Sequence, residues 1–280
     1  MRNGTFFDKV LYPFIRNIDL VHTGNQELVL LADIFLSLEY IEQENAERAE
    51  WLKDKRDFLC SLIYRNLDNE KDFQMRGKLL DKLYHLVWNT YSIVTKMDKE
   101  WLKRCHEHTL RLQDEFIKSD TANAANQAIL TLCLINMLYP YQKQDSELYM
   151  HINANIISWV EEWNQSLWHG LPILAALYRI AVMGKNSYML LEQNHDELIK
   201  NIWEHYCNTL TDSLPVKDMG LLGLLYLIGY DLYIGVDKNN KAFMESRFSS
   251  TEDRTEKLWC CAVILRCLST EDDATPFGTD

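Results

Sequence analysis

A helical pattern that recurs at nearly constant spacing limits the fold of this chain more than any other feature. Mostly apolar helices are predicted to begin near Glu27, Gly77, Ala124, Gly170 and Gly220, so the steps along the chain are 50, 47, 46 and 50 residues. A polar break and an amphipathic helix follow each apolar helix. This period is typical of stacked helical hairpins, because each hairpin has a face that it cannot bury alone. The sequence therefore predicts an all-α protein of five tandem hairpins.

The first and last repeats give the pattern in detail. The first helix of repeat one has apolar residues at helical spacing, from Leu28 to Leu38. Its second helix is predicted to bury a face that contains Trp51, Lys55, Phe58 and Leu62, opposite a solvated face of Lys53, Asp54, Arg56 and Asp57. The fifth repeat is predicted to run from Gly220 to Leu232, to pass a loop at Asp237–Asn240, and to end with a helix over Glu256–Leu268.

Two architectures fit such a repeat, a closed α/α toroid and an open α-solenoid. The first helices are apolar nearly all round, whereas the second helices are amphipathic. In a toroid the inner helices are enclosed by the outer helices, so the inner helices are apolar all round and the outer helices are amphipathic. In an open solenoid both helices of each hairpin keep a solvent-exposed face. We therefore expect the toroid, as a single hairpin-repeat domain over residues 1–280 with a frayed polar tail at 269–280. The open solenoid is the alternative.

Composition excludes several classes of partner. The net charge is −12, which argues against nucleic acid and anionic membranes, because phosphate binding needs clustered Lys and Arg. The sequence contains no apolar run typical of a signal peptide or membrane span, so we expect a cytoplasmic protein. The seven cysteines are odd in number and lack a CxxC pair, and most lie in apolar runs. Reduced core thiols explain them most simply.

The most distinctive segment runs from Ser166 to Leu177 and places Trp168, His169 and Gly170 at the mouth of a predicted helix. Pro172 suits the first turn of this helix, and Gly170 allows a tight turn before it. At a helix N-terminus the dipole disfavours the imidazolium, so His169 is a candidate acid or base. A packing or capping histidine beside Trp168 is the alternative interpretation.

This segment, together with Asp218–Tyr226, resembles the repeats of the lanthionine synthetase C-like cyclases. That family has an A-H-G-x-x-G motif followed by an apolar helix, and Gly220 and Gly223 match its G-L-x-G helix start. The resemblance implies an α/α toroid in which His169 corresponds to the proton-transferring histidine. It also implies that Trp168, Gly170, Gly220 and Gly223 lie at a ligand-binding mouth.

The zinc motifs of that family, W-C-Y-G and C-H-G, are absent. Cys105-His106 is followed by Glu107, and only Cys105 and His108 of this cluster share a helix face, so zinc lacks its three or four ligands. We therefore expect no metal and no cofactor. The resemblance then implies a zinc-less protein that binds a peptide or partner protein in a central cavity, as a helper in peptide modification.

Two other functions remain open. An open solenoid would present a concave surface to another protein. A carbohydrate-active toroid would need two carboxylates near the mouths of the inner helices, with Asp120, Asp212 and Asp218 as candidates. Asp218 is the best placed of these, although Asp is also a favoured helix N-cap.

Overall fold

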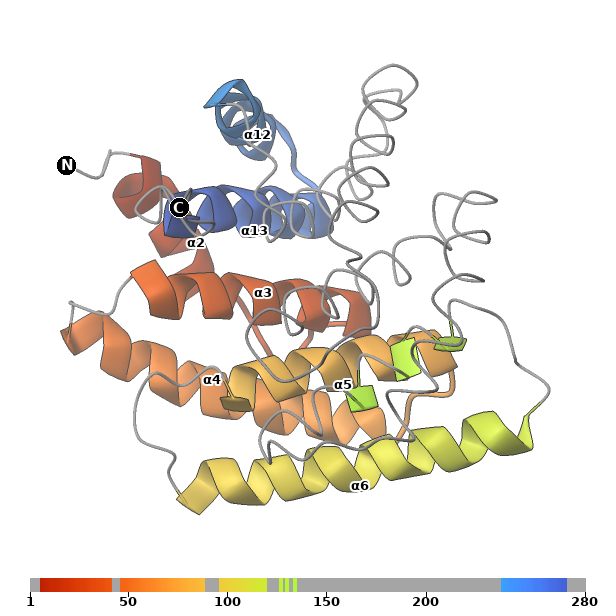
Figure 1. The fold of residues 1–280 in the computed structure, drawn as a ribbon. Coiled ribbons are helices and arrows are strands. Elements are labelled where there is room, and N and C mark those ends of the chain that lie inside the picture. Colours follow the sequence, from red (N-terminus) through yellow and green to blue (C-terminus); the bar gives the residue numbers. More distant parts are fainter. Residues whose placement is uncertain are drawn as a thin grey trace, which may run out of the picture. The chain divides into compact units, whose positions relative to one another are not determined.

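The computed structural model describes residues 6–41, 46–88, 96–119, 126, 127, 129, 130, 133, 134 and 238–270. These residues form helices and short connections without a strand, which confirms the all-α class for this part of the chain. The helices are η1 (Phe7–Leu11, a π-helix), α2 (Tyr12–Arg16), α3 (Asn25–Ile41), α4 (Ala46–Leu67), α5 (Phe73–Trp88), α6 (Lys96–Lys118), α12 (Lys238–Ser250) and α13 (Arg254–Thr270) (Figure 1).

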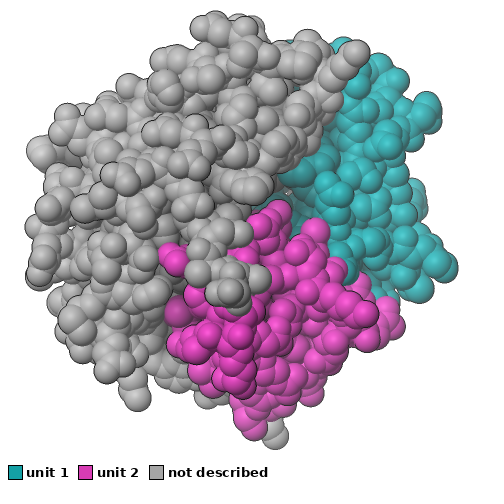
Figure 2. Space-filling view, turned by 90° about the vertical axis from the view of Figure 1, so that its right-hand side faces the viewer, with its two compact units in different colours: residues 1–63, 219–280 teal, residues 64–218 magenta. Residues whose placement is uncertain are grey.

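The chain divides into two compact units, residues 1–63 with 219–280 and residues 64–218 (Figure 2). The first unit therefore joins the two ends of the sequence, and the second holds α5 and α6. The prediction of a single domain stays a prediction. No helix in the described ranges is long and apolar enough to cross a membrane.

The predicted polarity of one helix in each of the first two hairpins, α3 and α6, is confirmed. In α3 the buried side chains lie nearly all round the helix: Leu28, Leu30, Leu31, Ala32, Ile34, Phe35, Ser37, Leu38 and Ile41. The amphipathic helix α6 buries Trp101, Leu102, Cys105, Thr109 and Leu112 at helical spacing and exposes its charged side. It packs along α5 (Figure 1), and a buried hydrogen bond of 2.9 Å joins Tyr84 Oη to Thr109 Oγ1.

The predicted face of α4 was only partly right: Leu62 is buried and Lys53 and Asp54 are exposed, as expected. Phe58 is exposed, whereas Leu52, Leu59 and Ile63 are buried. Arg56, placed on the solvated face, is also buried, and its Nη1 pairs with Glu39 Oε1 of α3 at 3.5 Å. A buried guanidinium is tolerated because the facing helix supplies a carboxylate, and a pattern that treats Arg as a solvated residue does not detect this.

The second hairpin begins earlier than expected, at Phe73 rather than Gly77. Asp72 caps α5, because its Oδ2 accepts a 2.9 Å hydrogen bond from the Met75 N–H. Gly77 therefore lies inside the helix, where a Cβ would come within 1.9 Å of Ile129 Cγ2. The described residues of the third predicted repeat are helical, and they pack on α5 at this glycine. Cys133 Sγ also lies 3.7 Å from the Gly77 carbonyl.

The loop predicted at Asp237–Asn240 was wrong, because residues from Lys238 onward begin helix α12. Met244 and Phe248 lie four residues apart on α12, and both are buried. The ring of Phe248 packs edge-on against Phe6 and Phe14, with centroids at 6.1 and 5.1 Å. This aromatic contact with the N-terminal segment stabilises α12 by tertiary packing, although its sequence contains few apolar residues.

Helix α13 packs along α3, and α12 packs on α13 (Figure 1). Six consecutive residues of α13, from Cys260 to Leu265, are buried, so the helix is enclosed all round. The prediction of an amphipathic second helix in repeat five is therefore wrong. The helix begins at Arg254 after the cap Asp253, whose Oδ1 accepts a 2.7 Å bond from the Glu256 N–H. It extends to Thr270, two residues into the predicted tail.

Polar contacts fasten the start of α13 to the segment that leads into α3. Arg254 Nη2 donates to the carbonyl oxygen of Asp19 and to Thr23 Oγ1, both at 2.9 Å. Arg254 Nε lies 3.6 Å from Glu27 Oε1, which also accepts a 3.3 Å bond from the Thr255 hydroxyl. Residues more than 200 positions apart in the sequence are thus in direct contact.

Candidate functional site

The sequence-predicted site residues lie outside the described residues: His169, Asp218, Trp168, Gly170, Gly220 and Gly223, together with Asp120 and Asp212. The cluster from Cys105 to His108 lies within α6 and can be placed. The site that the structure does describe is a cavity beside this cluster, in the unit of residues 64–218.

The cysteine and histidines of α6 point to different neighbours. Cys105 is fully buried, and its carbonyl accepts a hydrogen bond from Thr109 Oγ1. The His106 ring lies 6.0 Å from Tyr84, and the His108 ring meets Tyr64 edge-on at 5.2 Å. In the described residues no three His, Cys, Asp or Glu side chains converge as metal ligands. Burial lowers the pKa of both histidines below the usual value.

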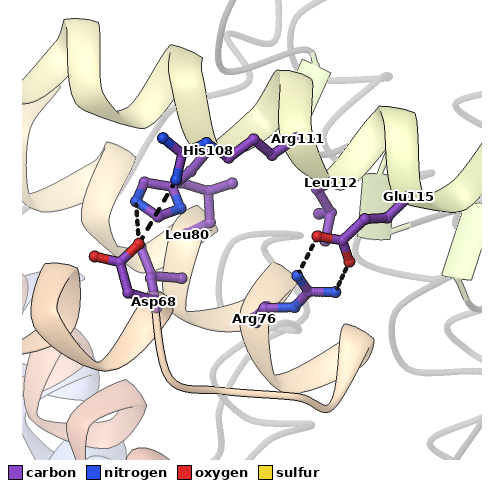
Figure 3. Close-up of a pocket in the computed structure, with 8 residues that line it drawn as sticks. Asp68, Arg76, Leu80, His108, Arg111, Leu112 and Glu115 are labelled. Atoms are coloured by element: carbon purple, nitrogen blue, oxygen red, sulfur yellow. Dashed lines mark hydrogen bonds and ion pairs between the residues drawn. The ribbon is translucent and has the colours of Figure 1, made fainter.

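The cavity lies where the end of α4 meets α5 and α6 (Figure 3). Its volume is about 110 Å³, which holds several water molecules or one small polar molecule and excludes a nucleotide-sized cofactor. Its lining combines three leucines with five charged or titratable side chains: Leu67, Leu80, Leu112, Asp68, Arg76, His108, Arg111 and Glu115.

One end of the cavity holds a closed ion pair. Arg76 of α5 donates from Nη1 to Glu115 Oε1 of α6 at 2.8 Å and from Nη2 to the other carboxylate oxygen. This two-pronged pairing raises the pKa of Arg76 and lowers that of Glu115. Both Glu115 oxygens therefore bond to Arg76 and the two charges are paired, although Arg76 Nε has no hydrogen-bond partner among the described residues.

The other end holds a looser cluster around Asp68, the residue that follows α4. Asp68 Oδ1 lies 3.7 Å from Arg111 Nη1 and 3.8 Å from His108 Nε2, both beyond hydrogen-bond distance (Figure 3). The His108 side chain is only 10% exposed. Desolvation lowers its pKa, with a smaller opposing effect from the Asp68 charge. His108 is therefore neutral at pH 7.

The described lining of the cavity contains carboxylate, guanidinium and imidazole groups but no serine, threonine or cysteine. The cysteines that the structure describes, 60, 105, 133, 260 and 261, are buried, which confirms the expected place of these five in the core. Burial raises the pKa of Cys260 to about 11, and that of Cys261 also rises, so neither thiol is activated.

The sequence pattern did not single out Asp68, Arg76, Arg111 or Glu115. Arg76 and Glu115 are 39 residues apart, and charged residues on amphipathic helices ordinarily indicate a solvated face. The one available signal was the Cys105–His108 cluster, which drew attention to α6 and to His108. Comparison with known proteins identified no matching family model, curated protein or solved structure.

Proposed function

We propose that this protein is a closed ring of helical hairpins that binds a peptide or a partner protein in its central cavity, without metal and without catalysis of its own. The proposal follows the resemblance to zinc-less lanthionine synthetase C-like proteins. The observation that carries it is the packing of α13, near the end of the chain, along α3 of the first hairpin.

This contact favours a ring over an open solenoid. In a solenoid each repeat contacts only its sequence neighbours, so the first and last repeats stay apart. A ring needs the opposite, because the last repeat must cover the face that the first cannot bury alone. The hydrogen bonds from Arg254 to Asp19 and Thr23 stabilise the same contact beside its apolar part.

The burial pattern supports the same interpretation. Helix α3 is buried nearly all round, as an inner helix must be, whereas α6 keeps a charged outer side. The contact of Ile129 with Gly77 brings the third repeat against the first helix of the second. Neighbouring hairpins that stack first helix on first helix are what an inner ring requires.

His169, Trp168 and Gly170 are proposed to line the ligand-binding mouth, with Gly220 and Gly223 at the start of a neighbouring inner helix. In this proposal His169 contacts the peptide by hydrogen bonding. Asp218 is proposed to lie beside it, where it caps a helix or accepts a peptide N–H. Thiol activation is not part of the proposed function, because the zinc that would lower the thiol pKa has no ligand set in the sequence.

Peptide selection tests this proposal. The full-length protein would be screened against a displayed library of random peptides, and a selected peptide would then be titrated by fluorescence anisotropy. His169→Ala should weaken its binding by tenfold or more, which is about 1.4 kcal/mol. His205→Ala is the matched control, because His205 lies on a predicted outer helix, and it should bind as the wild type does. Failure to select any peptide, or equal losses in both variants, would contradict the proposal.

A further inference from the structure

The cavity of the 64–218 unit presents two opposite charges, Asp68 and Arg111, that form a loose ion pair with each other. The side chains of Asp68 and Arg111 are 51% and 64% exposed, and their nearest charged atoms are 3.7 Å apart. Neither side chain makes a hydrogen bond within the described ranges, in contrast to the doubly bonded pair of Arg76 and Glu115. Asp68 and Arg111 therefore lie side by side, and both side chains can still form hydrogen bonds with a ligand.

His108 gives a second, independent indication of a missing partner. Its side chain is nine-tenths buried and directed at Asp68 in the cavity (Figure 3). Its Nε2 is buried and has no hydrogen-bond partner among the described residues. The Nε of Arg76, across the cavity, is also buried and also lacks a hydrogen-bond partner there. Buried polar atoms without partners are costly, so two in one small cavity indicate that a polar occupant completes the arrangement.

We propose that this cavity binds a free α-amino acid with a small side chain. The ammonium group pairs with Asp68 and the carboxylate with Arg111. These two ligand charges lie close together on one carbon skeleton, as the two protein charges lie close together at the cavity. Charge-assisted hydrogen bonds of this kind are about twice as strong as neutral ones.

The charge balance and the size of the cavity select the ligand class. Asp68 offsets Arg111, Glu115 offsets Arg76, and His108 is neutral, so the lining has no net charge and suits a zwitterion better than an anion or a cation. Leu67, Leu80 and Leu112 supply an apolar wall for a short side chain. The volume of about 110 Å³ limits the enclosed part of the ligand to a short side chain. This proposal does not depend on ring closure or on the peptide site.

A titration with L-alanine tests the proposal on the full-length protein. Amide chemical shifts would be followed by ¹H–¹⁵N NMR, with N-acetyl-L-alanine and L-alanine methyl ester as probes that each lack one charge. L-Alanine should shift a confined set of signals and saturate, with a Kd on the order of 1 mM or tighter. Each derivative should bind at least tenfold more weakly. A ligand with a large side chain, L-tryptophan, should not bind.

Two variants locate the site, and each has a matched control. Asp68→Asn and Arg111→Gln should each weaken alanine binding by at least tenfold. Asp114→Asn and Arg65→Gln make the same charge changes at exposed residues that do not line the cavity, and they should leave binding unchanged. The proposal is overturned if alanine causes no saturable shift at tens of millimolar, which would mean that the cavity holds only water. Equal binding of the blocked derivatives, or equal losses in the control variants, would also overturn it.

Discussion

At the scale of single residues, the two partly buried histidines of α6 link the stability of this helix pair to pH. Burial lowers the pKa of both His106 and His108, so the unfolded chain takes up protons at a higher pH than the folded protein does. At pH values between the unfolded-state pKa near 6.5 and the lower folded-state pKa, the unfolded state therefore binds more protons than the folded state. The contribution of these two histidines to the free energy of unfolding is therefore largest above pH 6.5, and it falls as the pH drops below this value.

Urea unfolding at pH 7.5 and pH 5.5 measures this effect. We expect the wild type to lose stability at the lower pH, by less than about 1.4 kcal/mol per pH unit for each histidine, because solvent screens a partly exposed ring. His108→Gln should reduce that loss, because its side chain takes up no proton in this range. His22→Gln changes an exposed ring and serves as the control. An undiminished loss in His108→Gln would show that this ring does not cause the pH dependence.

At the scale of helices, Gly77 fixes how closely α5 approaches the third repeat. Alanine is the better helix former by about 1 kcal/mol, so propensity alone predicts that Gly77→Ala stabilises the protein. The new Cβ would instead meet Ile129 Cγ2 at 1.9 Å, a contact that requires the packed helices to shift. Overpacking of this kind costs about 1–3 kcal/mol. Gly77→Ala should therefore be destabilising when measured by thermal or urea unfolding.

The double variant Gly77→Ala with Ile129→Ala identifies the cause. Removing the clashing methyl of Ile129 gives the new Cβ room, and the combined loss should be smaller than the sum of the two single losses. Additive losses would mean that the Cβ added at position 77 acts elsewhere than at Ile129. A stabilising Gly77→Ala would show that the two helices do not lie this close in solution.

The periodicity of the sequence predicted several of the described helices, but it did not predict which residues of other helices they contact. The apolar spacing of α3 and the amphipathic pattern of α6 were enough to predict these two helices. Arg56 was misplaced because its burial depends on Glu39 of another helix. The start of helix α12 was predicted as a loop because its Phe248 packs against Phe14, which lies far away in the sequence near the N-terminus.

The candidate cavity was beyond prediction for the same reason. Asp68, Arg76 and His108 come from the end of α4, from α5 and from α6, and no local motif joins them. Sequence spacing identified His108 as a helix neighbour of Cys105, whereas its partners in space are Asp68 and Tyr64. Patterns within one helix show which side is buried but not what it meets.

At the scale of the whole molecule, the contact between α3 and α13 is the basis of the proposed ring. It places the last described helix against the first hairpin, and it explains why α13 is enclosed all round instead of amphipathic. A helix at the free end of an open array would keep one side in water. The proposed ring gives α13 a neighbour on each side.

Small-angle X-ray scattering of the full-length protein tests ring closure most directly. A compact particle of 280 residues has a radius of gyration of about 19 Å. A closed ring of five hairpins should give a value close to this and a symmetric distance distribution. A markedly larger radius with an extended tail in the distance distribution would identify an open array and contradict the proposed ring.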